Sequence, residues 1–454
     1  MERFKVLDRN QQLLLPYDLR EWIPEDDFVN FVIEAVDSID VSHFSYNRRG
    51  TGSAGYHPHV LLSLLIYCYA NGIFSSRRIE KASYRDIAVR YILCNSHPDH
   101  STIASFRKNN AEAISEAFLS VLNLAKELKM LKVGTISVDG TKIKANAGKH
   151  QNIRYDRALQ LEEQLKIDIA ELMDKAEQAD FQISETADSL PKEISKREDL
   201  ANKIAIAKQN IETRNQKRYE KEKANYDAKV KAREKKVKPS RGKKPKPPSV
   251  KVDSKKCDNL TDSDSRVMKH NKTSELIQGY NAQAAVDADG TMLILGTYVT
   301  NECNDKKQLT AITSSVNERT GKVTTVLGDA GYGSEKQVKD VEKMDIDVLV
   351  SVHLGSLEEK RHYDFKPEKE LKKSAKKKVE KKWVTNMREK LIKPQNKEKY
   401  RKRQQTVEPV FGIIKQALGF RQFLTRGLEN VNNEWNLVAT AYNFKRLFSM
   451  KMAL

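Results

Sequence analysis

The spacing of apolar and polar residues predicts an all-helical domain over residues 56–130. Val60–Ala70 is an almost unbroken apolar run, which is typical of a buried helix. Ser75 or Ser76 is placed to cap the helix that follows. Ser101 is placed to cap a long helix whose apolar residues repeat on one face beyond position 120.

Basic residues lie near the starts of these predicted helices, and Arg107 and Lys108 are the clearest pair. Short helices with basic starts fit a DNA reader of the helix-turn-helix kind. A helical domain with only a packing role fits the same pattern equally well. We carry Arg107 and Lys108 forward as candidate DNA contacts.

Two narrow apolar stripes within residues 151–237 predict an antiparallel helical hairpin of coiled-coil type. The first stripe consists of Leu161, Leu165, Ile169, Leu172 and Ala176, and the second of Leu200, Ile204, Ala207 and Ile211. Residues 238–256 are rich in Lys and Pro and predict a disordered basic linker. This linker is either simply solvated or contacts phosphate without sequence selectivity.

The rest of the chain alternates between strand and helix patterns. The predicted strands are Thr135–Asp139, Tyr280–Asp287, Thr291–Thr300, Val323–Leu327 and Ile346–Val352. Asp289-Gly290 predicts a tight turn between the second and third strands, Gly321 a helix end, and Ser334 with Gln337 a capping box. This order predicts an α/β, ribonuclease-H-like core over residues 131–150 and 257–450, with the helical hairpin inserted after its first strand. A segment over residues 1–55 precedes the helical domain.

Composition narrows the class of partner. The 454 residues carry a net charge of +19 and the pI is near 9.4, which favours a large polyanion. Lys and Arg crowd residues 231–256 and 366–403. The four cysteines form no C-x-x-C pair, which argues against a zinc ribbon and fits a reducing cytosol. The most apolar run is too short to span a bilayer, so we expect no membrane association.

Three carboxylates are the candidates for chemistry. Asp139 and Asp329 each follow an apolar strand and precede small residues, a position where a ligand can approach. Two such carboxylates on neighbouring strands could share a cation such as Mg²⁺. Glu408 borders the apolar stripe of a later helix, and Lys415, about two turns further on, could hold a phosphate beside it. A turn or cap role for the aspartates and a solvated salt bridge for Glu408 are the plainer alternatives.

Pro409 leaves two helix geometries open around Glu408. Either Thr406 caps a helix with Glu408 in its first turn, or Glu408 lies in a longer, kinked helix. The relation of Glu408 to Lys415 is the same in both. Alignment of Arg401 with them requires the longer helix.

At these positions the sequence resembles bacterial insertion-sequence DDE transposases of the IS-four/IS-five type, with an eleven-eighty-two-like layout. The matching segments lie in order along most of the chain outside the hairpin and the lysine-rich insertions. They are Tyr56–Arg107, Val138–Lys142, Asn259–Met268, Gly279–Asp287, Val299–Leu309, Gly328–Tyr332, Tyr400–Lys415 and Glu434–Leu437. The resemblance implies no role for Asn259, Asp262 and Asp264 that we can derive.

The resemblance implies that Asp139, Asp329 and Glu408 are the catalytic triad and bind two ions of Mg²⁺ or Mn²⁺. It also implies a Y-R-E-K signature, which Tyr400, Arg403, Glu408 and Lys415 follow. Arg403 and Glu408 are separated by one residue more than the signature expects. Arg401 is therefore a rival to Arg403.

The expected function is a DNA transposase that cuts at insertion-sequence ends and transfers the strand to target DNA. Its expected partner is double-stranded DNA, both terminal inverted repeats and target, bound by a homodimer or a higher oligomer in the cytoplasm of a bacterium, in association with the nucleoid. Two alternatives stay open: a catalytically inactive or repurposed DNA-binding protein derived from a transposase, and a general nuclease or resolvase on the same fold.

Overall fold

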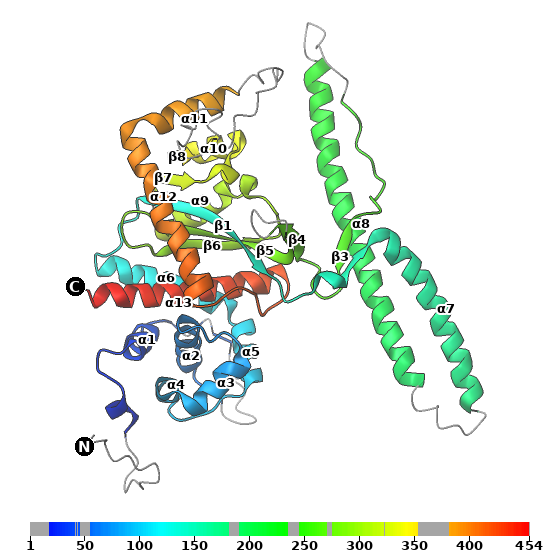
Figure 1. The fold of residues 1–454 in the computed structure, drawn as a ribbon, viewed down its shortest axis with the longest axis horizontal. Coiled ribbons are helices and arrows are strands. Elements are labelled where there is room, and N and C mark those ends of the chain that lie inside the picture. The colour runs from blue at the N-terminus through cyan, green and yellow to red at the C-terminus, as the bar shows by residue number, and fades with distance from the viewer. Residues whose placement is uncertain are drawn as a thin grey trace, which may run out of the picture.

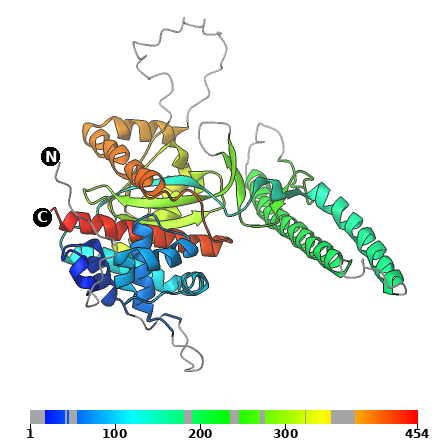
Figure 2. The same cartoon turned by 60° about the horizontal axis from the view of Figure 1, so that its bottom comes forward.

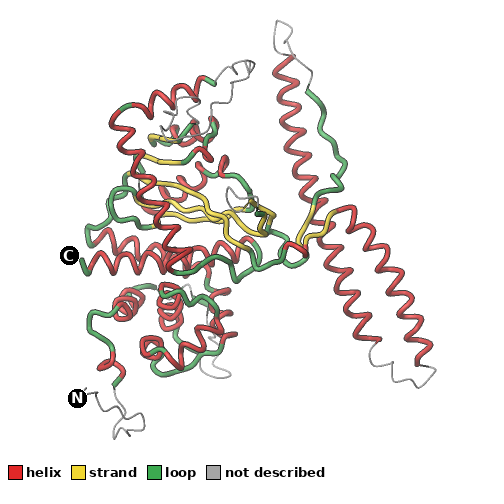
Figure 3. Tube along the Cα trace, in the orientation of Figure 1, coloured by secondary structure: helices red, strands yellow, loops and turns green. Residues whose placement is uncertain are grey.

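The computed structural model describes residues 18–40, 42, 44–45, 55–180, 190–234, 245–269, 275–321, 323–352 and 381–453. Within these ranges the chain is a mixed α/β protein with a helical N-terminal region (Figures 1 and 3). No described helix is both long enough and apolar enough to cross a membrane. The mixed α/β class and the helical start agree with the sequence prediction.

The N-terminal region is built of short helices. They are η1 (Leu19–Trp22), α1 (Phe28–Asp37), α2 (Pro58–Ala70), α3 (Ser76–Arg85), α4 (Ile87–Ile92), α5 (His100–Asn109) and α6 (Ala111–Glu127). Helix α2 is largely buried, as its apolar run predicts. Ser75 occupies the N-cap position of α3 without a capping hydrogen bond from its side chain.

The prediction of one long helix capped by Ser101 was wrong in two respects. Asp99 caps the helix instead, because its carboxylate accepts a hydrogen bond from the backbone N–H of Thr102 at 2.6 Å. The apolar face is also divided between α5 and α6 at Asn110. Asn110 leaves the helical conformation at φ −117° and ψ 40°, and its side chain donates to the Phe106 carbonyl at 2.9 Å and accepts from the Ser45 N–H at 2.6 Å.

A six-stranded sheet forms the centre of the molecule. Its strands are β1 (Thr135–Lys144), β4 (Arg266–Lys269), β5 (Leu276–Asp287), β6 (Ile294–Thr300), β7 (Thr325–Gly328) and β8 (Asp347–Val350). The order is β6-β5-β1-β7-β8, and β4 pairs with the first residues of β5. The pairs β1–β5 and β5–β6 are antiparallel, and β1–β7 and β7–β8 are parallel.

Local turn chemistry agrees only in part with the predictions. The β5–β6 turn contains Gly290 at φ +135°, and the Asp287 carboxylate accepts from the Thr291 N–H at 2.9 Å across it. Gly321 ends the helix before β7, at φ +112°. Ser334 makes no capping hydrogen bond, and Gln337 instead accepts from Thr310 on a neighbouring helix, so the predicted capping box is wrong.

Helices cover the sheet and connect it to the N-terminal region. They are α9 (Leu309–Thr320), α10 (Glu335–Glu342), α11 (Lys382–Ile392), α12 (Pro394–Gly412) and α13 (Leu428–Lys451), with 3-10 turns η2 (Lys149–Gln151), η3 (Asp305–Lys307) and η4 (Ala330–Tyr332) and a π-helical turn η5 (Ile413–Ala417). Helix α13 lies between the sheet and helices α1–α5, and α6 runs alongside it (Figures 1 and 2). A single hydrophobic cluster therefore runs from α1 through the sheet to α13.

Helices α7 (Tyr155–Asp180) and α8 (Leu190–Glu234) form an arm that projects away from the sheet (Figure 1). Leu165, Ile204 and Ala207 are buried between them, as the two stripes predict. Strands β2 (Asn152–Arg154) and β3 (Cys257–Asn259) pair at the base of the arm. Of the predicted linker, residues 238–244 lie outside the described residues, and 245–256 contain no helix or strand.

Candidate active site

The sheet brings Asp139 and Asp329 to the same edge. Strands β1 and β7 are parallel neighbours with Ser137 opposite Leu327, so each aspartate lies two residues beyond this pair. The prediction that Asp139 ends a strand was wrong, because β1 continues to Lys144 against β5. Its pairing with β7 nevertheless stops before Asp139. The aspartate therefore lies where one flank of β1 has no partner strand.

Asp329 also has a local structural role. Its carboxylate accepts a hydrogen bond from the Gly331 N–H at 2.8 Å and caps η4. A plain capping role was one of the alternatives for this residue. The cap uses only Oδ1 of Asp329, so Oδ2 is not needed for it.

Helix α12 brings Glu408 to β1, and an arginine separates the two acids. Pro409 lies inside α12, so the longer-helix alternative is the observed one. Arg403 donates to Glu408 Oε1 at 3.0 Å and to Asp139 Oδ2 at 3.5 Å. The Arg403 side chain is 10% exposed, Asp139 is 20% exposed and Glu408 is 51% exposed. Arg403 therefore occupies the space between the two carboxylates.

Asp139 and Arg403 both lie in energetically unfavourable surroundings. The pKa of Asp139 is raised to about 6, mainly by burial; Arg403 opposes the rise and nearby Asp329 adds to it. The Arg403 Nε is buried and has no hydrogen-bond partner among the described residues. A buried donor without a partner is uncommon, and a raised carboxylate pKa is typical of functional sites.

Lys415 reaches the same edge from the π-helical turn η5. Its ammonium donates to the Lys142 carbonyl on β1 at 3.1 Å. Burial lowers the pKa of Lys415, and the charge of Asp139 opposes this fall. Single π-helical turns are often found at functional sites because they re-aim side chains.

Tyr400 and Arg401 have different surroundings. The Tyr400 hydroxyl donates to the Gly328 carbonyl at 3.1 Å, so the ring fixes the end of β7 just before Asp329. This is a positioning contact. Arg401 is exposed on α12.

Several site residues were missed at the sequence level. Asp305, at the start of η3, accepts from Asn281 at 2.7 Å and from Gln283 at 2.8 Å. Its carboxylate lies 3.8 Å from the Lys142 ammonium. A signal was present, since Asn281 and Gln283 are polar residues on one face of an otherwise apolar strand. Gln283 also accepts from the hydroxyl of buried Tyr332.

Arg107 and Lys108 lie away from this site. Arg107 is buried at the end of α5 and donates to the Tyr69 hydroxyl at 2.7 Å and to the Phe74 carbonyl at 3.3 Å. A guanidinium enclosed in this way has no surface to offer a phosphate, so we remove Arg107 from the candidate DNA contacts. Lys108 is exposed.

Asn259, Asp262 and Asp264 have structural contacts that explain their presence. The Asp262 carboxylate accepts from the buried Tyr280 hydroxyl at 2.8 Å, and Asp264 accepts from the Leu428 N–H at 2.9 Å. Asn259 donates to the Gly148 carbonyl at 2.9 Å. These bonds tie the base of the α7–α8 arm and the start of α13 to the sheet.

The carboxylates do not meet at one point. Within the described ranges, no three His, Cys, Asp or Glu side chains lie close enough to hold a metal ion together. The charged contact of Glu408 with Arg403 accounts for part of this separation. Asp139, Asp329 and Glu408 still suit a hard divalent cation, since they offer negatively charged carboxylate oxygens at a partly buried position.

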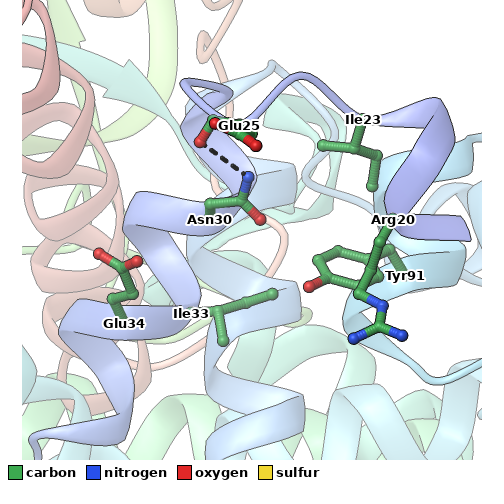
Figure 4. A pocket seen from close by; sticks show the side chains of 7 residues that line it. All are labelled: Arg20, Ile23, Glu25, Asn30, Ile33, Glu34 and Tyr91. Carbon is green, nitrogen blue, oxygen red and sulfur yellow. Dashed lines mark hydrogen bonds between the residues drawn. The ribbon is translucent and has the colours of Figure 1, made fainter.

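A separate cavity near the N-terminus contains none of the predicted site residues. It measures about 380 Å³ and is lined by residues of η1 and α1 and by Tyr91 (Figure 4). Asn30 donates to the Glu25 carbonyl at 3.1 Å at its rim. Its position away from the sheet edge excludes it from the site described above.

Comparison with known families gives two matches that do not overlap and together cover more than half of the chain. The family model described as "Transposase DDE domain" matches residues 249–444, which include Asp329 and Glu408. The one described as "Transposase domain (DUF772)" matches residues 17–109. Asp139 lies between the two matched segments. Its assignment to the candidate active site therefore rests on the sheet geometry. Comparison with curated proteins and with solved structures gives no match.

Proposed function

Since the chain belongs to the DDE transposases of bacterial insertion sequences, we propose that it cuts DNA at the ends of such an element and joins the cut end to target DNA. The observation that carries this proposal is that Asp139 and Asp329 lie at one edge of two parallel neighbouring strands, with Glu408 joined to Asp139 through Arg403. The strand order, with three antiparallel strands followed by two parallel ones, supports a ribonuclease-H-like core.

Asp139, Asp329 and Glu408 are the residues that would hold the divalent ions used by this family. The chemistry supplied by such ions, when bound, is activation of water towards a phosphodiester and stabilisation of the leaving oxygen. Glu408 must first turn away from Arg403, and its exposure of 51% leaves room for that rotation. Burial leaves the ionised carboxylate of Asp139 poorly hydrated, so a bound cation would stabilise it.

The cationic side chains of the site have distinct tasks in this proposal. Arg403 neutralises Asp139 and Glu408 before DNA arrives. It is as buried as Arg107, so it contacts a backbone phosphate only after Glu408 has turned away from it. Lys415, held against β1, binds a second phosphate without reading bases. Tyr400 positions Asp329 through the end of β7.

The test is a nicking assay on a plasmid that carries the terminal repeats flanking the gene. Asp139→Asn, Asp329→Asn and Glu408→Gln should each keep DNA binding and abolish Mg²⁺- or Mn²⁺-dependent cleavage. Asp199→Asn, which changes an exposed acid on α8, is the matched control and should cleave normally. Full cleavage by any one of the three variants removes that residue from the triad.

The same assay separates the rival functions. A wild-type protein that binds the plasmid and never nicks it is the repurposed DNA-binding protein. Equal cleavage of scrambled and natural ends indicates a general nuclease. Cleavage and joining that require the natural ends support the transposase.

A further inference from the structure

A second group of cations lies at the base of the α7–α8 arm, outside the site described above. A cavity of about 430 Å³ opens between α8, β3 and β4. Five basic residues line it: Arg214, Arg218, Lys255, Lys256 and Arg266. Figure 1 shows that this place is the junction where the arm joins the sheet.

The positive charge of this cavity is only partly compensated. Asp258 pairs with Arg214 at 2.8 Å, and Glu222 lies 3.9 Å from Arg218. The ammonium groups of Lys255 and Lys256 have no ion-pair or hydrogen-bond partner within the described part of the chain. Fixed cations gathered around a cavity favour an anion there.

The arginines add specific donors to this charge. The Arg218 Nε is buried and has no hydrogen-bond partner among the residues described. The Nη2 of the same side chain donates to Asn215 at 2.8 Å, which holds the guanidinium at the cavity wall. This Nε faces Glu222 Oε1 at 3.9 Å, which is too long for a hydrogen bond. A planar guanidinium held at a cavity wall matches the geometry of a phosphate.

The cavity and the catalytic edge share one short loop. Cys303 lines the cavity, and its thiol contacts the Val267 carbonyl of β4 at 3.7 Å. Two residues further along, Asp305 lies 3.8 Å from Lys142 at the catalytic edge. Cys303 is also close enough to Lys142 to influence the pKa of that lysine. A polyanion that occupies the catalytic edge can therefore extend into the cavity.

We propose that this cavity, lined by Arg214, Arg218, Lys255, Lys256 and Arg266, binds a backbone phosphate of the DNA whose scissile bond lies at the catalytic edge. The site rests on the proposed function for the identity of its ligand. The α7–α8 arm would then take part in DNA binding, because α8 supplies Arg214 and Arg218. A free phosphate ion offers the same chemistry, and the experiments below separate the two sources.

The first test measures DNA affinity against salt, in EDTA so that no cleavage occurs. The variant Lys255→Ala/Lys256→Ala removes two unpartnered ammonium groups and leaves the fold intact. The control Lys192→Ala/Lys196→Ala removes two exposed charges from α8. These lysines lie roughly 30 Å from Arg214 along the helix, at its rise of about 1.5 Å per residue.

The cavity variant should bind an element-end duplex about tenfold more weakly at low salt. Its plot of log affinity against log salt should flatten by roughly 0.9 for each phosphate that the protein no longer neutralises, whereas the control should keep the wild-type slope. Equal behaviour of the two variants overturns the proposal. Full DNA affinity in the cavity variant, combined with loss of inorganic phosphate binding, overturns it in favour of a free anion.

The second test uses the cysteines already present. Cys257 and Cys303 are exposed and line the cavity, and Cys94 is exposed in the helical region. A duplex with a thiol tether on a single phosphate, moved one position at a time, should form a disulfide at one preferred position. The cross-link should be lost in Cys257→Ser/Cys303→Ser and kept in Cys94→Ser; the reverse pattern overturns the site.

These outcomes are distinct from failure of the proposed function. A protein that cross-links through the cavity and never cleaves retains the phosphate site and loses the transposase activity. A protein that cleaves normally and shows no cavity dependence retains the activity and loses the phosphate site.

Discussion

Replacement of Asp139 by Asn should stabilise the metal-free protein while it abolishes cleavage. Burial raises the pKa of Asp139 from 3.8 to about 6, so its ionised form is less favourable in the folded protein than in the unfolded chain. At about 1.4 kcal/mol per pKa unit, the charge costs about 3 kcal/mol of unfolding free energy. Asn keeps the shape of the side chain and carries no charge.

The pKa of about 6 already includes the opposing effect of Arg403, so loss of the ion pair between Asp139 and Arg403 is not subtracted from this gain a second time. At 3.5 Å it is the longer of the two interactions that Arg403 makes, and the 3.0 Å interaction with Glu408 remains. The stability difference depends on pH with a defined sign. A raised carboxylate pKa adds stability below pH 3.8, and that contribution is lost as the pH rises through about 6.

The assay is thermal or urea unfolding of wild type and Asp139→Asn in EDTA, from pH 4 to pH 8. We expect the advantage of the variant to grow from below about 1 kcal/mol at pH 4 towards about 3 kcal/mol at pH 8. For a domain of 150–250 residues this corresponds to a melting temperature higher by roughly 6–12 °C. Mg²⁺ should then stabilise the wild type more than the variant.

Asp199→Asn is the control for the general effect of removing a negative charge from a basic protein. It should change stability by less than about 0.5 kcal/mol, as most exposed substitutions do. A variant Asp139→Asn that melts at or below the wild-type temperature at pH 8 refutes the reasoning. So does an advantage that is the same at every pH.

Three further predictions concern the site and its support. Gly140→Ala should lower the cleavage rate on the order of 100-fold in a single-turnover assay, because the new Cβ would lie 2.5 Å from Asp305 Oδ1; normal cleavage would contradict this. Lys415→Ala should weaken binding of an element-end duplex and lower the salt slope by roughly 0.9, and an unchanged slope would exclude a phosphate contact. Glu434→Ala should cost roughly 3–5 kcal/mol in urea unfolding, because it leaves the partly buried N–H groups of Leu424 and Thr425 without their acceptor and removes a negative charge near Arg107; a loss below about 1 kcal/mol would show that these interactions do not stabilise the fold.

The sequence by itself determined the order of the elements and much of their identity. Apolar residues recur every second position in strands and every third or fourth in helices, so these periods predicted five strands of the sheet and the α7–α8 arm, whereas the short strand β4 was missed. The sequence also determined that Asp329 follows a strand directly and that Lys415 follows Glu408 by two turns. Such features depend on neighbours in the chain, which is why they can be predicted locally.

Only the tertiary structure decided which side chains meet. Arg403 lies between Asp139 and Glu408 because helix α12 packs against β1, 264 residues away in the chain. Arg107 is enclosed by Tyr69 and Phe74, which lie 38 and 33 residues away in the chain, and nothing in its own surroundings in the sequence indicates this. A charged side chain has the same local signature whether it is solvated or paired, since its partner comes from a distant segment of the chain.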